Sequence, residues 1–174
     1  METHIHAGYI PGAIGRITEL HGTYYHTHWG FHLFFEAKVA SELAAFLSRF
    51  TPEHDGFWLA LVDQTIAGAI AIDGSESAPQ VARLRWFIVA PEYHGTGIGK
   101  KLMHTALDFC QQASFQKVYL TTFAGLDTAR YLYEQVGFVC IEEGVDKHWG
   151  NPVTEQTFEL VLSHSSSTTF AQER

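Results

Sequence analysis

The stretch that decides the fold is Leu84-Arg-Trp-Phe-Ile-Val89-Ala-Pro-Glu-Tyr-His94-Gly-Thr-Gly97-Ile-Gly99-Lys-Lys-Leu102, near the middle of a chain of 174 residues. Its first part is apolar, β-branched and aromatic, which predicts a strand that ends at Pro91. A glycine-rich turn follows, and beyond it apolar residues recur at helical spacing from Ile98 to Phe109. The stretch therefore predicts a strand, a glycine turn and a helix over about residues 97–112.

This turn has the chemistry of a phosphate-binding loop. The first turn of a helix presents backbone N–H groups without partners, and the helix dipole adds partial positive charge there. Glycines let the backbone approach a ligand closely, because no Cβ stands in the way. The alternative is that Gly95, Gly97 and Gly99 only shape the turn, but glycines at alternate positions favour phosphate. Lys101 replaces the Ser or Thr of a nucleoside-triphosphate loop, and the third glycine comes too early for a dinucleotide fingerprint.

Composition argues against several classes of protein. The formal net charge is −8 and the pI is about 5.7, which argues against nucleic-acid binding through clustered Lys and Arg. No apolar run reaches the roughly 18 residues of a membrane span, and the first residues lack the pattern of a signal peptide. The two cysteines need not pair. We therefore expect a cytoplasmic protein without a nucleic-acid or membrane partner.

The hydrophobic pattern divides the chain into one domain over residues 1–162 and a polar, flexible C-terminal tail over residues 163–174. The expected order is strand, helix, helix, three strands, helix, strand, helix and two strands. The helices that the pattern places are 33–50, 97–112 and 126–136, and the strands are 57–62, 66–72, 81–89, 117–123, 138–143 and 153–162. Meandering strands followed by helical crossovers predict an α/β fold with a mixed central sheet and helices on both faces.

The first 32 residues are unusual in their glycine and histidine content. Pro11 and the glycines around it predict a short strand with turns over residues 8–18. The aromatic residues that follow suggest one wall of a substrate pocket. Two histidine pairs have members two residues apart, as on one side of a strand: His4 with His6, and His26 with His28. No cysteine or carboxylate set completes a metal site, so we expect no metal.

Two motifs at the expected separation together resemble the GNAT superfamily of N-acyltransferases. Its acyl-CoA motif, Arg/Gln-x-x-Gly-x-Gly/Ala, follows a strand that ends in Val-x-Pro. Here Val89-Ala-Pro91 ends the strand, Gly97 and Gly99 are the motif glycines, and His94 takes the Arg/Gln place. The second motif is Ala129-Arg-Tyr-Leu-Tyr133-Glu-Gln-Val-Gly137-Phe138, which is similar to the family's A-x-x-x-Y-x-x-x-G-F. Several segments look most like the acetyltransferase half of proteins that fuse a MarR-type winged helix to a GNAT domain.

The resemblance implies a GNAT fold, acetyl-CoA as co-substrate, and transfer of an acetyl group to the primary amine of a small metabolite or amino acid. It places the pantetheine arm and acyl group on the backbone of Ile88 and Val89. It places the pyrophosphate on the loop residues, which are His94, Gly95, Thr96, Gly97, Ile98, Gly99 and Lys100. The Val89 N–H would stabilise the developing oxyanion, and Tyr133 stands at the general-acid position.

The chain also departs from the family's pattern. Leu126 replaces an Asn that often contacts the cofactor, and arginines replace a Glu that often acts as general base. The base stays open among Glu19, Glu36, His26 and His28. The alternative function is therefore a catalytically silent acyl-CoA-binding sensor or regulatory module. Exposed edge strands are compatible with a homodimer.

Arg83 and Arg85 bear on the choice of acceptor. They alternate with Leu84 and Trp86, so both guanidinium groups are expected on one face of the strand. If that face borders the acceptor pocket, the arginines would bind a carboxylate-bearing acceptor by bidentate pairing. The alternatives are a solvated sheet face, or ion pairs with the acidic residues Glu142, Glu143 or Glu155.

Overall fold

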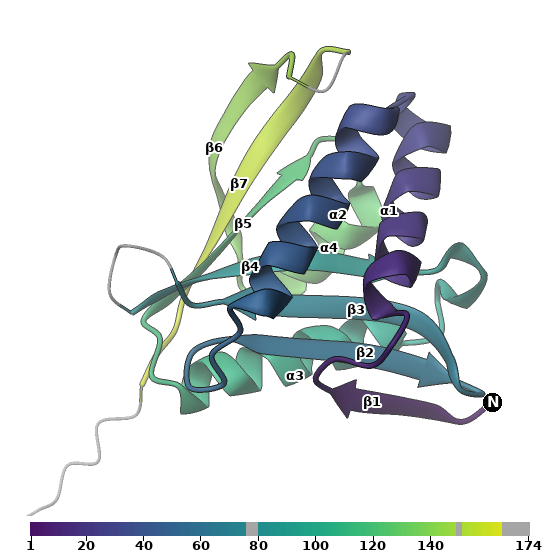
Figure 1. Cartoon of the computed structure of the whole chain (residues 1–174). Coiled ribbons are helices and arrows are strands. Elements are labelled where there is room, and N and C mark those ends of the chain that lie inside the picture. Colours follow the sequence, from purple (N-terminus) through teal and green to yellow (C-terminus); the bar gives the residue numbers. More distant parts are fainter. Residues whose placement is uncertain (76–79, 149–150, 165–174) are drawn as a thin grey trace, which may run out of the picture.

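A seven-stranded mixed sheet forms the centre of the molecule (Figure 1). The computed structural model describes residues 1–75, 80–148 and 151–164. The strands are β1 Thr3–Ala7, β2 Gly56–Val62, β3 Thr65–Asp73, β4 Val81–Val89, β5 Lys117–Phe123, β6 Val139–Asp146 and β7 Val153–Val161. They lie in the order β1-β2-β3-β4-β5-β7-β6, and β4 with β5 is the one parallel pair in the described chain. The predicted mixed sheet is confirmed.

Helices cover both faces of this sheet, as predicted. They are α1 Ala13–Trp29, α2 Leu33–Ser48, α3 Ile98–Gln112 and α4 Asp127–Gln135, with a short 3-10 turn at Pro91–Tyr93. One core lies under α1 and α2 and includes Ile17, Leu43 and Phe46. A second lies under α3 and α4 and includes Leu102 and Tyr133. A third joins the start of α2 to β5 and β7 and includes Phe35, Phe123 and Val153. The strand–turn–helix unit of the opening stretch thus packs its helix on the face opposite to α1 and α2.

The N-terminal segment differs from its prediction. The expected order includes a helix before residues 33–50, and residues 13–29 form it as α1, but its first turns occupy part of residues 8–18, where the sequence predicted a short strand with turns. Gly15, Gly22 and several histidines lower the intrinsic helix propensity here, so the helical pattern is weak. Tertiary packing outweighs that cost, because Gly22 lets α1 approach α2 so closely that a Cβ would lie 3.2 Å from the Glu36 side chain. His26 and His28 consequently point to different sides of a helix, not to one side of a strand.

The flexible C-terminal tail over residues 163–174 stays a prediction. Residues 165–174 of the predicted tail lie outside the described residues, as do residues 76–79 and 149–150. Within the described part, the His164 Nε2 lies 2.7 Å from the carbonyl oxygen of Phe115, next to the start of β5. The chain is therefore held to the domain at least as far as His164.

Strands β4 and β5 pair only briefly and then diverge. Among the described residues, the pairing joins Val81–Arg83 to Lys117–Tyr119, after which β5 continues beside β7. The Ile88 carbonyl faces β3, because a Cβ on Gly68 would lie 2.8 Å from that oxygen. Neighbouring residues of a strand direct their backbone groups to opposite sides. The N–H and carbonyl of Val89 therefore face the opening between β4 and β5.

A bulge in β4 changes the predicted alternation of side chains. Ala69 pairs with Ile88 but Ala71 pairs with Arg85, so Trp86 and Phe87 together oppose one residue of β3. Trp86 has a φ of 46°, in the left-handed region that side chains rarely adopt. Its ring packs against Phe46 of α2, at 5.3 Å between centroids. The expectation that Trp86 shares the face of Leu84 was therefore wrong, and Trp86 lies on the arginine side.

Asp73 at the end of β3 ties this region together. Its carboxylate accepts hydrogen bonds from Arg49 at 2.7 Å and from the Ser75 hydroxyl at 2.6 Å, and it contacts Arg85 at 3.3 Å. Burial alone would raise the pKa of Asp73, but the bonds from Ser75 and Arg49 outweigh it and hold the pKa at about 2. Because the folded-state pKa is depressed, this stabilisation is present above about pH 4 and is lost as the pH falls towards 2.

Asp73→Asn should lower the free energy of unfolding at pH 7 by about 2 kcal/mol, because the variant loses the stabilisation that accompanies ionisation. Urea unfolding at pH 7 and pH 3 measures this difference, which should shrink at pH 3, where the wild-type carboxylate begins to protonate. Asp108→Asn, at an exposed position on α3, is the matched control and should change little. A pH-independent difference for Asp73→Asn would contradict the assignment.

Candidate active site

Two pockets of about 400 Å³ each open beside β4 and meet at three aromatic side chains. We call one the glycine-loop pocket, which is lined by the turn after β4, the end of β4 and the start of α4. The other is the arginine pocket, which is lined by Arg83, Arg85 and parts of α1, α2, β5, β6 and β7. Tyr25, Phe87 and Tyr133 line both. A ligand that extends through one pocket would therefore reach a ligand in the other at these three residues.

The glycine loop has the backbone geometry that the sequence suggested. Gly95 and Gly97 have φ values of 76° and 85°, which disfavour any residue with a Cβ. The first α-helical bond of α3 runs from the Lys101 N–H to the Gly97 carbonyl, at 3.0 Å. The N–H groups of Ile98 and Gly99 precede that bond and have no intrahelical partner. The loop therefore presents free donors at the positive end of a helix.

Most of the predicted cofactor residues line this pocket together. They are Ile88, Val89, His94, Gly95, Gly97, Ile98 and Gly99. Thr96 and Lys100 are exposed but do not line it, and the Thr96 hydroxyl donates to the Tyr93 carbonyl at 2.6 Å. The lysines after the loop are thus solvated helix residues in this structure.

His94 has a local role that sequence reasoning missed. Its Nε2 lies 2.8 Å from the carbonyl oxygen of Val89. The carbonyl can only accept, so the ring donates and fixes the end of β4 against the loop. The N–H group of Val89 lies on the same edge of β4 and stays available to a ligand. The His94 side chain is thus engaged with the strand instead of extending from the loop.

The start of α4 forms the far wall of the glycine-loop pocket. Leu126, Asp127 and Thr128 line it, and the first helical bond of α4 runs from the Arg130 N–H to the Leu126 carbonyl, at 2.9 Å. A second helix N-terminus therefore borders the pocket. Leu126, which replaces the Asn of the pattern described above, places an apolar side chain on this wall.

Tyr133 lies at the junction of the two pockets and is only 5% exposed. Its ring packs against Phe87, at 6.1 Å between centroids, and against Phe138, at 5.9 Å. Burial, with a smaller contribution from Tyr25, raises the pKa of Tyr133 above its ordinary value. The phenol is consequently protonated at neutral pH and can act as a proton donor.

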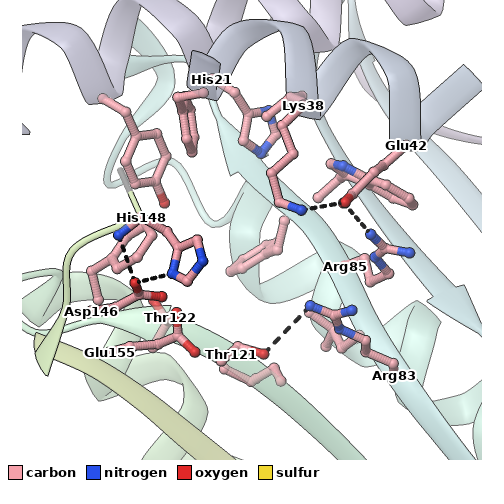
Figure 2. A pocket seen from close by; sticks show the side chains of 18 of the residues that line it. His21, Lys38, Glu42, Arg83, Arg85, Thr121, Thr122, Asp146, His148 and Glu155 are labelled. Carbon is pink, nitrogen blue, oxygen red and sulfur yellow. Dashed lines mark hydrogen bonds and ion pairs between the residues drawn. The ribbon is translucent and has the colours of Figure 1, made fainter. Parts of the chain in front are cut away.

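The arginine pocket contains opposed charges, with Arg83, Arg85, Lys38 and Glu42 together in Figure 2. Arg85 is bound by acidic groups, with Glu42 at 2.6 Å and Asp73 at 3.3 Å. These partners differ from Glu142, Glu143 and Glu155, which the sequence offered as alternatives. The charge of Arg85 is therefore balanced within the protein.

Arg83 is held less firmly. Its guanidinium lies 3.5 Å from the Thr121 hydroxyl and 5.9 Å from the centroid of the Tyr119 ring. Its Nε is buried and has no hydrogen-bond partner among the described residues. A buried donor without a partner costs free energy, which a ligand that accepts from it would recover. Arg83 is therefore the arginine in this pocket that is available to an anionic group.

Among the polar residues of the arginine pocket that were not singled out from the sequence are His21 on α1, Asp146 at the end of β6, and His148 just after it. The four candidates for a base (Glu19, Glu36, His26 and His28) do not line either pocket within the described part of the chain. Glu19, His26 and His28 lie on α1 and Glu36 lies on α2, and neighbouring positions of a helix face different directions. No sequence signal marked His148, which lies at a loop and reaches the pocket only through the fold.

Neither a metal site nor a membrane span is found in the described part of the chain. In residues 1–75, 80–148 and 151–164, no group of three or more His, Cys, Asp or Glu could hold a metal ion. In the same residues, no helix is long and apolar enough to cross a membrane.

Curated proteins with similar sequences carry N-acetyltransferase names. The camello protein of Xenopus tropicalis, named a probable N-acetyltransferase, is 36% identical over 86 residues, which are 49% of this chain and 39% of that protein. N-acetylaspartate synthetase of Xenopus tropicalis is 34% identical over 92 residues, 53% of this chain and 33% of that protein. The N-acetyltransferase YjgM of Escherichia coli is 32% identical over 94 residues, 52% of this chain and 54% of that protein. The chain thus spans about a third to a half of these relatives.

Solved structures show the same fold at low sequence identity. A GNAT-family acetyltransferase from Staphylococcus aureus has a TM-score of 0.73 at 19% identity, covering 93% of this chain and 100% of that one. The acetyltransferase yncA from Salmonella typhimurium, solved with its cofactor acetyl-CoA, has a TM-score of 0.73 at 14% identity. The match covers 95% of this chain and 96% of that one. The model of the acetyltransferase (GNAT) family matches residues 16–138 of this chain, a range that includes the glycine loop and Tyr133. The chain therefore belongs to the GNAT family of acetyltransferases.

Proposed function

We propose that the chain is an acetyl-CoA-dependent N-acetyltransferase that acts on the primary amine of a carboxylate-bearing small molecule, an amino acid in the first place. The observation that carries the proposal is the junction of two pockets at Tyr133 and Phe87 beside the open edge of β4. One pocket has donors for an anionic, extended ligand, and the other has charged groups for a small polar one. Family membership supports acetyl-CoA as the extended ligand.

The glycine-loop pocket fits acyl-CoA in its chemistry. The free N–H groups at Ile98 and Gly99 would hold the pyrophosphate at the N-terminus of α3. The open edge of β4 would pair with the amides of the pantetheine arm, as an added strand pairs with a sheet. When bound, acetyl-CoA supplies an activated thioester carbonyl. The Val89 N–H faces that edge and would donate to the carbonyl oxygen, as an oxyanion-hole donor does.

Tyr133 would hold the proton that the leaving thiolate takes. Burial keeps the phenol protonated, and a donor in a water-poor site is well placed for general-acid catalysis. Phe87 and Tyr25 share the junction and would exclude water from the thioester. Binding both substrates side by side supplies further rate through proximity.

The arginine pocket would hold the acceptor. We assign the acceptor's carboxylate to Arg83, whose donors are incompletely used, while Arg85 is already balanced by Glu42 and Asp73. Several relatives are named N-acetylaspartate synthetase, which supports an amino acid as acceptor. L-Aspartate is therefore the first probe, within a panel of other amino acids, polyamines, aminoglycosides and peptides.

Arg83→Gln should raise the KM for the best amino-acid acceptor about 10- to 100-fold, because a charged hydrogen bond to the carboxylate is lost. The KM for acetyl-CoA should stay unchanged, since Arg83 does not line the glycine-loop pocket. Thiol release measured with the amine panel gives both values. Arg130→Gln, an exposed arginine on α4, is the matched control. An unchanged acceptor KM in Arg83→Gln would remove Arg83 from acceptor binding.

Tyr133→Phe should lower kcat about 100-fold and leave acetyl-CoA binding nearly unchanged, because only the proton donor is removed. Steady-state thiol release and calorimetric titration with acetyl-CoA measure the two quantities separately. Tyr131→Phe, at a 65% exposed position on the same helix, is the matched control. Wild-type turnover in Tyr133→Phe would exclude the phenol from the mechanism.

The alternative is a silent acyl-CoA-binding module, of the kind that the resemblance to regulator-fused domains suggests. It is favoured by the engaged side chain of His94 and by the apolar Leu126 where the family often has Asn. That function predicts tight acetyl-CoA binding without thiol release from any amine of the panel. Thiol release that depends on the acceptor would exclude it.

A further inference from the structure

We propose that His148, oriented by Asp146, takes the proton from the acceptor's ammonium group and so acts as the general base of the proposed reaction. The inference rests on the proposed function and supplies the one chemical role that the sequence left open. An amine attacks a thioester only as the neutral form, whereas most primary amines are protonated at neutral pH. A base that borders the acceptor pocket therefore decides how much of the bound acceptor can react.

Asp146 and His148 form a pair with a defined geometry at the end of β6. One carboxylate oxygen of Asp146 accepts from the backbone N–H of His148 at 2.7 Å and from its Nδ1 at 2.9 Å (Figure 2). These bonds lower the pKa of Asp146, which is therefore ionised at neutral pH. Because Nδ1 carries the hydrogen that is donated, Nε2 keeps its lone pair. The pair thus presents a basic nitrogen whose tautomer is fixed by a carboxylate.

Both residues line the arginine pocket, and Figure 2 shows them well separated from Arg83 and Arg85 across it. An amino acid whose carboxylate is bound at Arg83 would extend its ammonium group away from the arginines. The side chain of His148 is 85% exposed, so a proton that it accepts can pass to water. Position and solvent access together suit a base that must be regenerated in each cycle.

The second imidazole of the pocket suits this role poorly. His21 is 6% exposed, and its Nδ1 donates to the Ile17 carbonyl at 2.8 Å. Burial lowers the pKa of His21 to about 4, although the bond to Ile17 opposes that effect. An imidazole that avoids protonation so strongly is a weak acceptor for an ammonium proton. His21 can accept a hydrogen bond from the acceptor, but it cannot hold the proton.

Other ionisable groups face the same pocket and share in its charge balance. They are Glu155 on β7, Lys38 and Glu42 on α2, Tyr25 on α1, Tyr133 on α4, and Arg83 and Arg85 on β4. Burial raises the pKa of Tyr25 and of Tyr133, so both keep their protons and neither can serve as the base. Lys38 is bound to Glu42 at 2.5 Å. Glu155 is the remaining acidic group, and it belongs to the strand that pairs with β6.

The proton transfer balances without a further reactant. An N–H bond of the ammonium group breaks, its electron pair stays on nitrogen, and the proton joins Nε2 of His148. The neutral amine then forms the new bond to the thioester carbon, and the sulfur leaves with the electron pair of the broken C–S bond. The leaving sulfur takes the proton of Tyr133, and the nitrogen, which carries a positive charge after the attack, gives its second proton to the Tyr133 oxygen and so restores the phenol. The imidazolium of His148 returns its proton to water.

The test compares His148→Gln with wild-type protein, with the best acceptor from the amine panel and saturating acetyl-CoA. His148→Gln should lower kcat about 100-fold at pH 7, with an unchanged KM for acetyl-CoA. The loss should shrink as the pH rises towards the pKa of the acceptor amine, because the neutral amine then arrives without help. His148→Ala should regain activity when free imidazole is added. Asp146→Asn should lower kcat about tenfold, because the tautomer of His148 is no longer fixed.

The matched control is His54→Gln, because His54 makes the same Nδ1 contact with Asp55, also at 2.9 Å, but lines neither pocket. This variant should retain wild-type kcat. Equal, pH-independent losses in His148→Gln and His54→Gln, or wild-type activity in His148→Gln, would overturn the role of His148 while the transferase activity stands. Acetyl-CoA binding without thiol release from wild-type protein would overturn the proposed function, and the role of His148 with it.

Discussion

The divergence of β4 from β5 after Arg83 is the constraint on which the rest of the structure depends. Two parallel strands that separate leave backbone donors and acceptors without partners in the middle of a sheet, which is costly unless something else pairs with them. Here the edge at Val89 borders a pocket whose other walls are the glycine loop and the start of α4. The opening therefore leaves room for an extended ligand beside the Val89 N–H, while the Val89 carbonyl is bound by His94.

The bulge at Trp86 determines what lies beside that opening. It places Trp86 against α2 on the arginine side, while Phe87 turns towards Tyr133 and the opposite core. Arg85 is then covered by Glu42 and Asp73, and the guanidinium lies 4.1 Å from the centroid of the Trp86 ring. Arg83, two residues before Arg85, has no carboxylate partner of this kind among the described residues and contacts the Thr121 hydroxyl instead. The bulge in β4 thus gives the two arginines different roles. Arg85 supports the wall of the pocket, and Arg83 is available to a ligand.

Much of the fold and of the candidate site could be predicted wherever the sequence signal is local. Glycines at positive φ, an apolar strand and a periodic helix lie next to one another in the stretch from Leu84 to Leu102, so the sequence indicates them directly. The bounds of helix α1 could not be predicted, because its stability depends on packing against α2 and not on propensity. The bulge at Trp86 depends on its register with β3. His148 reaches the pocket only because β6 and β7 bring its loop there.

We propose that the open edge of β4 and the glycine loop form one acyl-CoA site. Hydrogen–deuterium exchange with and without acetyl-CoA tests it most directly, because bound ligand would protect backbone N–H groups that the free protein leaves open. Slower exchange is expected in peptides that cover Phe87 to Lys100 and the start of α4. Binding of acetyl-CoA with unchanged exchange over these segments, and protection elsewhere, would contradict it.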